Sequence, residues 1–208
     1  TIDETTTFGM DMARDAQWIV SCGYRGSIHF HGGDDAAPLH TIEPTQASLC
    51  AIQFVDGDNR IVAAGDTGII YHWQIECDDQ RNIVATTLLH AWETGEDYIN
   101  YLCVDGSRLW AAGTSVSCWD DEECVYVWDD DEECFCIARV GQCLAVGDAE
   151  STIMVYHPDT GASYLLRNYS EEPKALAVAR GIMAVGFGDG TLHLHELQFR
   201  DGQWVVDV

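Results

Sequence analysis

Five versions of one apolar phrase, each closed by glycine, decide the fold of this 208-residue chain: WIVSCG (18–23), RIVAAG (60–65), RLWAAG (108–113), QCLAVG (142–147) and GIMAVG (181–186). We align these phrases on their closing residues, Gly23, Gly65, Gly113, Gly147 and Gly186. Successive copies are separated by roughly 40 residues, a period that indicates a repeated supersecondary unit. The chain is therefore expected to consist of several copies of one small unit that pack on one another.

Three further strand patterns surround the phrases in most units. Alternating segments follow four of them, at GSIHFH (26–31), GIIYHW (68–73), STIMVY (151–156) and GTLHLH (190–195). Candidate strands precede all five, at FGMDM (8–12), LCAIQF (49–54), YINYLCV (98–104), CFCIA (134–138) and KALAVA (174–179). A more variable fourth strand is predicted at PLHTI (38–42), IVATTLL (83–89), SYLLR (163–167) and QWVVDV (203–208). Helical periodicity does not extend over about ten residues anywhere.

Four short antiparallel strands in a unit of about 40 residues are typical of a β-propeller blade. We predict an all-β chain that forms a β-propeller of about five four-stranded antiparallel blades, in a single domain over residues 1–208. The approximate units are 1–44, 45–94, 95–132, 133–171 and 172–208. Because five units account for the chain, a closed five-bladed ring is favoured. No strand is visibly shared between the two ends, so part of a larger or open ring, completed by another chain, is the alternative.

The third unit contains the acidic stretch SCWDDEECVYVWDDDEEC (117–134) and allows two strand assignments. In one, Val116–Asp120 is the third strand and Cys124–Trp128 the fourth; in the other, a longer hairpin makes Val125–Trp128 the third. We favour the first assignment, because it fits four strands into the shortest repeat interval. The acidic segments DDEE (120–123) and DDDEE (129–133) then become two exposed connections of one sheet.

The repeats resemble those of the WD-repeat family. LHTIEPTQASLCAIQFVDGDNRIVAAGDTGIIYHWQI (39–75) is similar to one whole repeat, and VDGSRLWAAGTSVSCWD (104–120) is similar to another. The resemblance covers nearly all of the chain but is degenerate. At the family's Trp-Asp position the units have His31-Gly32, Trp73-Gln74, Trp119-Asp120, Tyr156-His157 and His195-Glu196. The family's Asp-His-Ser-Trp hydrogen-bond network therefore cannot be assembled, while the resemblance implies a rigid, non-enzymatic platform for other proteins within a complex.

The net charge of the chain indicates which class of partner it can bind. Thirty-five acidic residues oppose ten lysines and arginines, for a formal net charge of −25. Such a chain repels nucleic-acid phosphates and anionic membranes, and it attracts basic proteins. We therefore predict a protein partner with an Arg/Lys-rich segment, and neither nucleic acid nor membrane as a partner. The predicted partner-binding residues are the acids of the two connections: Asp120, Asp121, Glu122, Glu123, Asp129, Asp130, Asp131, Glu132 and Glu133.

The alternatives to this scaffold are a glycosidase-like enzyme and a metal-binding module. A five-bladed glycosidase-like hydrolase needs paired carboxylates on its innermost strands, and Asp11 is the only carboxylate on those strands. A metal-binding module could use the pair His29 and His31 or the pair His193 and His195, since residues two apart on a strand share a face. When the repeats are aligned, the positions of both pairs are occupied by large packing residues in the other units. We therefore expect no catalytic residue, no metal site and no cofactor.

The nine cysteines are scattered through the chain, with no Cys-x-x-Cys spacing. Several lie in apolar runs, where cysteine behaves as a small buried hydrophobe. We read them as reduced thiols of an intracellular protein, cytoplasmic or nuclear. No apolar run approaches the roughly 20 residues of a membrane span, and no signal peptide opens the sequence.

Overall fold

The computed structural model describes residues 6–42, 47–55, 57, 59–106, 108–120, 123–128 and 133–206, apart from the side chain of residue 126. Within these ranges the chain is all-β, and its only helix is the three-residue 3-10 turn η1 (Tyr24–Gly26). This confirms the prediction of an all-β chain. Among the described residues, there is no helix with the length and apolar character that crossing a membrane requires.

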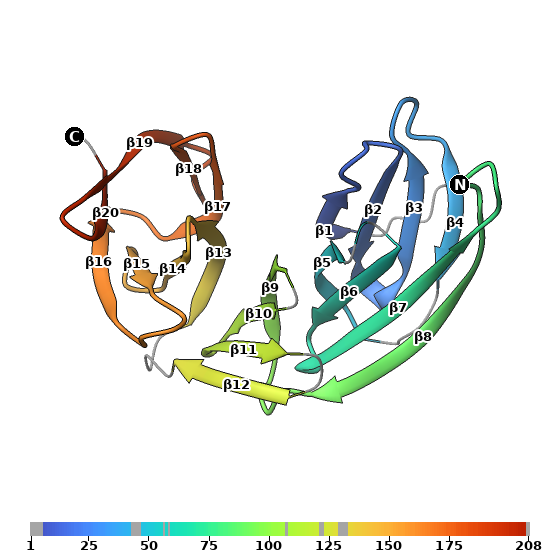
Figure 1. Ribbon diagram of the computed structural model, residues 1–208, viewed down its shortest axis with the longest axis horizontal. Coiled ribbons are helices and arrows are strands. Elements are labelled where there is room, and N and C mark those ends of the chain that lie inside the picture. Colours follow the sequence, from blue (N-terminus) through green and yellow to red (C-terminus); the bar gives the residue numbers. More distant parts are fainter. Residues whose placement is uncertain are drawn as a thin grey trace. The chain divides into compact units, whose positions relative to one another are not determined.

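The strands form five four-stranded antiparallel sheets in the part of the chain described, and consecutive strands are hydrogen-bonded neighbours in each (Figure 1). The first sheet consists of β1 (Thr7–Met12), β2 (Trp18–Gly23), β3 (Ile28–Gly32) and β4 (Pro38–Ile42). The second consists of β5 (Leu49–Val55), β6 (Arg60–Gly65), β7 (Ile69–Cys77) and β8 (Ile83–Glu93). The third consists of β9 (Ile99–Asp105), β10 (Arg108–Gly113), β11 (Val116–Asp120) and β12 (Glu123–Trp128). The fourth consists of β13 (Cys134–Val140), β14 (Cys143–Asp148), β15 (Thr152–Tyr156) and β16 (Ser163–Asn168). The fifth consists of β17 (Pro173–Ala179), β18 (Ile182–Phe187), β19 (Leu192–Arg200) and β20 (Gln203–Val206).

Each sheet falls within one repeat unit of the sequence, so the prediction of four-stranded antiparallel units is confirmed. In the third sheet, β11 covers Val116–Asp120 and β12 covers Glu123–Trp128. This confirms the first of the two strand assignments considered for the acidic stretch. It follows that the segment 120–123 includes the connection between β11 and β12.

The alignment of the five phrases on their closing glycines is wrong by one residue in the last two units. Gly65 pairs with the first residue of β5, whereas Asp148 and Phe187 make the equivalent pairs with the first residues of β13 and β17. A Cβ on Gly65 would lie 2.1 Å from the carbonyl oxygen of Ser48, so this position admits only glycine in the second sheet. In the fourth and fifth sheets the backbone accommodates a side chain there, and the glycine lies one position earlier.

The chain divides into two compact units, one of residues 1–111 with 119–124 and one of residues 112–118 with 125–208. Within each unit the sheets stack face to face. We call the face that packs on the next sheet in chain order the forward face, and the opposite one the backward face. Successive residues of a strand point to opposite faces, so β6, in a sheet that packs on both faces, is buried along all but its first residue.

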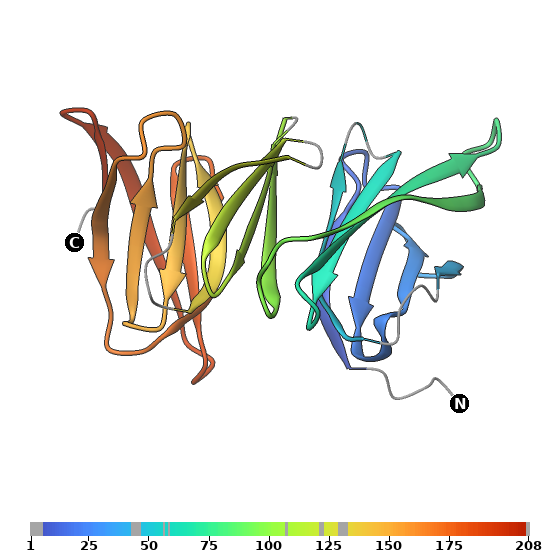
Figure 2. The ribbon, with the colours of Figure 1, turned by 90° about the horizontal axis from the view of Figure 1, so that it is seen from below.

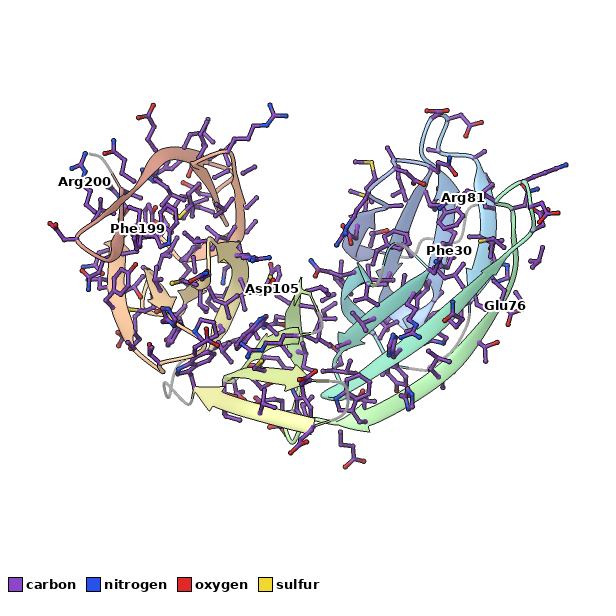
Figure 3. The ribbon with its side chains drawn as sticks, viewed as in Figure 1. Phe30, Glu76, Arg81, Asp105, Phe199 and Arg200 are labelled. Atoms are coloured by element: carbon purple, nitrogen blue, oxygen red, sulfur yellow. The ribbon has the colours of Figure 1, made fainter. Side chains whose placement is uncertain are left out.

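In the first unit, two cores lie between consecutive sheets. Between the first and second sheets, Trp18 and Phe30 of the forward face pack with Ile61 and Trp73 of the backward face. Phe30 is fully buried in this core (Figure 3). Between the second and third sheets, small forward-face residues such as Ala64 pack with larger residues of the third sheet; the described core is Ala51, Val62, Ala64, Ile70, Ile99, Leu102, Leu109, Ala111 and Trp119.

The second unit repeats this arrangement between the fourth and fifth sheets. Ala145 and Ile153 of the fourth sheet's forward face pack with Met183, Val185 and other residues of the fifth sheet's backward face. Burial of side chains as large as Ile153, Met183 and Val185 stabilises the fold by about 1.5–3 kcal/mol each relative to exposure. Apolar burial between sheets is therefore what holds both units together.

The first strands of the first three sheets, β1, β5 and β9, are also joined by polar side chains. The Asp11 carboxylate on β1 accepts a hydrogen bond from the backbone N–H of Phe54 on β5, at 2.8 Å. The Gln53 side-chain oxygen on β5 accepts from the backbone N–H of Val104 on β9, also at 2.8 Å. Asp11 and Gln53 occupy equivalent positions, since they pair with Val20 and Val62. Each of these side chains therefore ties its sheet to the next one.

The second sheet has unusually long outer strands, β7 with nine residues and β8 with eleven. Figure 2 shows their hairpin extending past the other strands of the sheet. Arg81 in its turn lies 3.1 Å from the Asp15 carboxylate and 4.9 Å from the centre of the Trp18 ring (Figure 3). The hairpin is thereby fastened to the first sheet.

Candidate functional site

The first predicted acidic connection joins β11 to β12. Asp120 ends β11 and Glu123 begins β12, and both side chains are exposed. Asp121 and Glu122, between them, lie outside the described residues. Two exposed carboxylates at the ends of adjacent strands can attract a cation, but each alone is worth little in water.

The second predicted acidic connection joins β12 to β13. Glu133, next to the start of β13, is half-buried, and its backbone carbonyl accepts a hydrogen bond from Ala149 at 3.0 Å. The remaining predicted residues of this connection, Asp129, Asp130, Asp131 and Glu132, lie outside the described residues. Glu133 belongs to the second compact unit, whereas Asp120 and Glu123 belong to the first.

The residues of the Trp-Asp signature separate into a buried and an exposed part. Trp119 is buried in the core between the second and third sheets, with its ring 6.3 Å from that of Trp92. Asp120, the last residue of β11, is exposed, although the four residues before it are buried. The tryptophan therefore stabilises the stacking of sheets and leaves the aspartate at the surface.

A polar cavity of about 390 Å³ lies within the second unit and was not anticipated from the sequence. Its walls come from the β14–β15 turn, the β16–β17 link and the β18–β19 turn. The lining residues are Ser151, Ser170, Glu171, Glu172, Lys174, Gly188 and Asp189. The sequence signals in hindsight are the acidic pair beside the chain's only lysine, in SEEPK (170–174), and the glycine-rich turn GFGDG (186–190).

The cavity carries more negative than positive charge. Lys174 is held by Glu172, with 2.5 Å between Nζ and Oε2, and it also lies over the Phe135 ring, 3.2 Å from its centre. Asp189 accepts hydrogen bonds from the backbone N–H and the hydroxyl of Thr191, which hold the pKa of its carboxyl below the ordinary value. Glu171 and Asp189 therefore remain as carboxylates beside an already neutralised ion pair. Such a cavity suits a cationic side chain better than an anion.

The two histidine pairs lie on the backward faces where the repeat columns place them. His29 bonds the hydroxyls of Thr41 and Ser27 at 3.2 and 3.1 Å, on the first sheet. His195 lies 2.9 Å from the Tyr169 hydroxyl through Nε2, and its ring packs beside His193 and Tyr169. Burial, Arg167 and His193 lower the pKa of His195, while burial raises the pKa of Tyr169 to about 12. The pair on the fifth sheet therefore belongs to an aromatic cluster, as the packing interpretation predicted.

Among the described residues, the structure brings together no set of side chains that would support the glycosidase-like or the metal-binding alternative. The Asp11 carboxylate bonds the N–H groups of Met12 and Phe54, both at 2.8 Å, which gives it a structural role. In the described ranges, there is no group of three or more His, Cys, Asp or Glu side chains placed to hold a metal ion. The prediction that catalytic residues are absent stays a prediction.

None of the nine cysteines forms a disulfide bond in the structure. Burial raises the pKa of Cys22 and of Cys136 to about 12, so these two thiols stay protonated near neutral pH. Cys22 also donates weakly to the carbonyl oxygen of Leu49, at 3.4 Å. They pack as small apolar side chains and are not nucleophiles.

The sequence matches no protein-family profile, and no curated protein resembles it at a significant level.

Proposed function

We propose that the chain is a WD-type β-propeller that acts as a non-enzymatic scaffold, binding a basic protein segment within a multiprotein complex. The five sheets are its blades, either as a closed five-bladed ring or as part of a larger or open ring. Support for the blade interpretation comes from the forward-on-backward stacking of four-stranded sheets in both units. The WD-type resemblance rests on the residues of the repeats, above all Trp73 and Trp119, which are both buried between sheets.

The observation that carries the proposed partner chemistry is the distribution of charge. The chain has 35 acidic residues against ten lysines and arginines. Asp120 and Glu123 are exposed at one sheet end, and the cavity of the second unit presents Glu171 and Asp189. A surface with this excess of carboxylates attracts Arg/Lys-rich segments over a distance of about a Debye length and repels phosphates. Nucleic acids and anionic membranes are therefore not the proposed partners.

The absence of disulfide bonds among the nine cysteines supports an intracellular location, which is part of this proposal. Thiols persist in a reducing compartment and are prone to oxidise outside it. The glycosidase-like alternative has less support, because the Asp11 carboxylate already bonds two backbone N–H groups. The metal-binding alternative has less support because the described residues contain no group of three or more His, Cys, Asp or Glu side chains placed to hold a metal ion.

Peptide titration tests the proposal. An Arg/Lys-rich peptide is titrated into the protein and binding is measured by calorimetry, at low and at high NaCl concentration. An Asp/Glu-rich peptide is the negative control. Binding of the basic peptide should weaken steeply as salt rises, because ionic screening removes the attraction between exposed charges. A basic-peptide affinity that ignores salt would contradict the proposal.

Charge variants then separate a specific site from a general charge effect. The variant D120N/D121N/E122Q/E123Q removes four carboxylates from the β11–β12 connection, and E171Q/D189N removes those of the cavity. The matched control D34N/E76Q/D79N/E93Q removes four exposed carboxylates elsewhere. A specific site requires that one of the first two variants loses affinity while the control retains it. Equal losses in all three would leave only non-specific attraction.

A further inference from the structure

A cluster of basic and aromatic side chains lies where the fourth and fifth sheets pack, within the second unit. Arg167 on β16 belongs to the forward face of the fourth sheet, because it pairs with Ile153, a residue of the core between the two sheets. His193 and His195 on β19 belong to the backward face of the fifth sheet. The packing of the two sheets therefore brings one guanidinium and two imidazoles to the same contact.

The ring of Tyr169 is the common neighbour of these groups. Cζ of Arg167 lies 5.6 Å from the centre of this ring, and the ring centres of His193 and His195 lie 5.9 and 5.8 Å from it. The Tyr169 hydroxyl lies 2.9 Å from Nε2 of His195. Phe187, buried in the core, places its ring 5.0 Å from that of Tyr169 and 4.9 Å from that of His193. The basic groups are thus held around one aromatic ring.

Arg167 is half-buried and has no carboxylate beside it. Within the described ranges, its guanidinium forms no ion pair and no hydrogen bond, and its Nε atom is buried. A buried N–H donor without an acceptor is destabilising, and a guanidinium cannot give up its charge. This is unexpected in a chain with 35 acidic residues, where Arg81 and Lys174 each pair with a carboxylate. Arg167 therefore has N–H groups to offer to an acceptor from outside the described residues.

Positive charge is concentrated around Arg167. The titratable groups that face His195 are Tyr169 and Arg167 from the fourth sheet and His193 from its own strand. Burial, Arg167 and His193 lower the pKa of His195. Asp189 interacts electrostatically with His193, but its carboxyl already accepts hydrogen bonds within its own turn. An anion beside Arg167 would relieve the repulsion between these basic groups.

The donors and their surroundings indicate which anion fits. A guanidinium presents parallel N–H groups that match the two oxygens of a carboxylate. The lowered pKa of His195 leaves its imidazole neutral near neutral pH, so Arg167 supplies the fixed positive charge. A chain of net charge −25 repels multiply charged anions such as phosphate more strongly than a singly charged carboxylate. The aromatic neighbours suit a ligand with an aromatic body.

We infer that Arg167 binds the carboxylate of an aromatic monocarboxylate ligand at the contact between the fourth and fifth sheets. The guanidinium N–H groups donate to the carboxylate oxygens, and the ring of the ligand packs beside Tyr169 and the exposed His193. As pH falls, His195 takes up a proton and adds a second positive charge beside the carboxylate, so binding strengthens. This site is separate from the proposed binding of a basic segment, and the two can fail separately.

An NMR titration of the isotope-labelled protein with benzoate is the first experiment. We expect saturable shifts of the Arg167 Nε–H and of the His195 ring, with benzamide, which lacks the charge, as the control. The pKa of His195 should rise towards its ordinary value when benzoate is bound, because the carboxylate offsets the charge of Arg167. Absence of saturable shifts would overturn the inference. This measurement needs no variant, so it holds even if a substitution disturbs folding.

Inorganic phosphate tests the class of anion, and a tripeptide that ends in phenylalanine tests its source. Binding of phosphate as tight as that of benzoate would overturn the assignment of a carboxylate ligand. The tripeptide should bind with a free C-terminus and fail to bind when amidated. If it binds more tightly than benzoate, the carboxylate belongs to a protein C-terminus; if less tightly, it belongs to a small acid. Equal binding of the amidated and free forms would contradict a contact through the carboxylate.

Arginine variants then test the identity of the site. R167Q should weaken benzoate binding by at least about tenfold, because it removes a charge-assisted bidentate contact. R167K retains the charge without the parallel N–H groups and should lose less. R180Q removes an exposed arginine of the same unit and is the matched control, with unchanged binding expected. Equal weakening in R167Q and R180Q would reduce the effect to general charge and overturn the inference.

Two further measurements separate loss of the site from other causes. Circular dichroism melting checks that R167Q remains folded; if it does not, the comparison of R167K with R180Q decides in its place. Binding of the Arg/Lys-rich peptide should persist in R167Q. Loss of benzoate binding with retained basic-peptide binding supports the inference and leaves the proposed function intact, whereas saturable benzoate binding without basic-peptide binding supports the inference alone.

Discussion

The contact between the first and second sheets and the contact between the fourth and fifth share one strand order but differ in chemistry. The first is filled by large aromatic side chains, Trp18, Phe30 and Trp73, and is closed by the tie from Asp11 to the Phe54 N–H. The second is filled mainly by aliphatic residues such as Val185, and Ala138 stands where Asp11 stands in the first sheet. At its margin lie Tyr169 and His195, which bond each other.

Both contacts therefore pack a forward face on a backward face, but the side chains that fill them differ in chemistry. The first contact depends on the volume of its aromatic residues and on the part-buried hydrogen bond between Asp11 and the Phe54 N–H. The second depends on aliphatic packing and on a histidine whose pKa is lowered by burial, Arg167 and His193. The two contacts should therefore respond differently to truncation, to loss of a hydrogen bond and to pH.

The largest effect is expected from Phe30→Ala. Phe30 is fully buried between the first and second sheets, and its truncation should lower the free energy of unfolding by about 3–5 kcal/mol. Met183→Ala, in the second contact, should cost less because a smaller volume is removed. Urea denaturation measures both. Phe199→Ala, on an exposed ring of the β19–β20 hairpin (Figure 3), is the control and should change stability by less than about 0.5 kcal/mol.

The polar tie gives the next largest effect. Asp11→Ala leaves the Phe54 and Met12 N–H groups without their acceptor and should cost about 1–3 kcal/mol in urea denaturation. Asp11→Asn retains one acceptor oxygen and should cost less. If Asp11→Ala were neutral, the tie would contribute nothing and the two contacts would differ only in packing.

The pH response should separate the second contact from the first. Because His195 has a lowered pKa in the folded state, the unfolded chain takes up its proton first as pH falls below the ordinary value of 6.5. The stability due to neutral His195 is thus present above pH 6.5 and declines as pH falls towards the lowered pKa. Stability measured between these limits should fall more steeply in the unmodified protein than in His195→Gln. Identical slopes would contradict the assignment.

Arg81→Ala should have the smallest effect. The Arg81–Asp15 ion pair is partly exposed, with side chains 44% and 34% accessible, so its loss should cost at most about 0.5 kcal/mol. The stacking of Arg81 on Trp18 makes local protection the better readout. Hydrogen exchange in the β7–β8 turn should accelerate while that of β2 stays unchanged. Arg81→Lys, which retains the charge but loses the planar stacking, is the matched variant.

Much of this fold could be predicted from the sequence. The alternation of apolar residues along a strand and the residues that form turns depend only on neighbours in the chain. The strands around the five phrases, and the assignment of Val116–Asp120 as β11, follow from a period of two and from the shortness of the third unit. The misplaced alignment in the fourth and fifth units had a signal as well. Gly65 precedes Ile70 by five residues, whereas Gly147 precedes Ile153 by six, so the glycines could not be equivalent in the same hairpin.

The cavity of the second unit could not be read from the sequence. Ser151, Glu171 and Asp189 come from three separate connections, and nothing in their spacing says that those connections meet. The role of Asp11 was equally hidden: the sequence shows only that it lacks a second carboxylate for glycosidase chemistry, whereas the packing of β5 on β1 reveals the Phe54 N–H that donates to it. Contacts between sheets depend on residues far apart in the chain, which periodicity does not encode.

By itself the sequence determined the all-β class, the five four-stranded units and the strongly negative charge, because each depends on composition or on neighbours along one strand. Only the tertiary structure decided which faces pack on each other within each unit, and where Asp11 and Gln53 tie sheets together. The physical reason is that a side chain becomes buried only when two sheets pack together, whereas the alternation of apolar and polar residues lies within the sequence of a single strand.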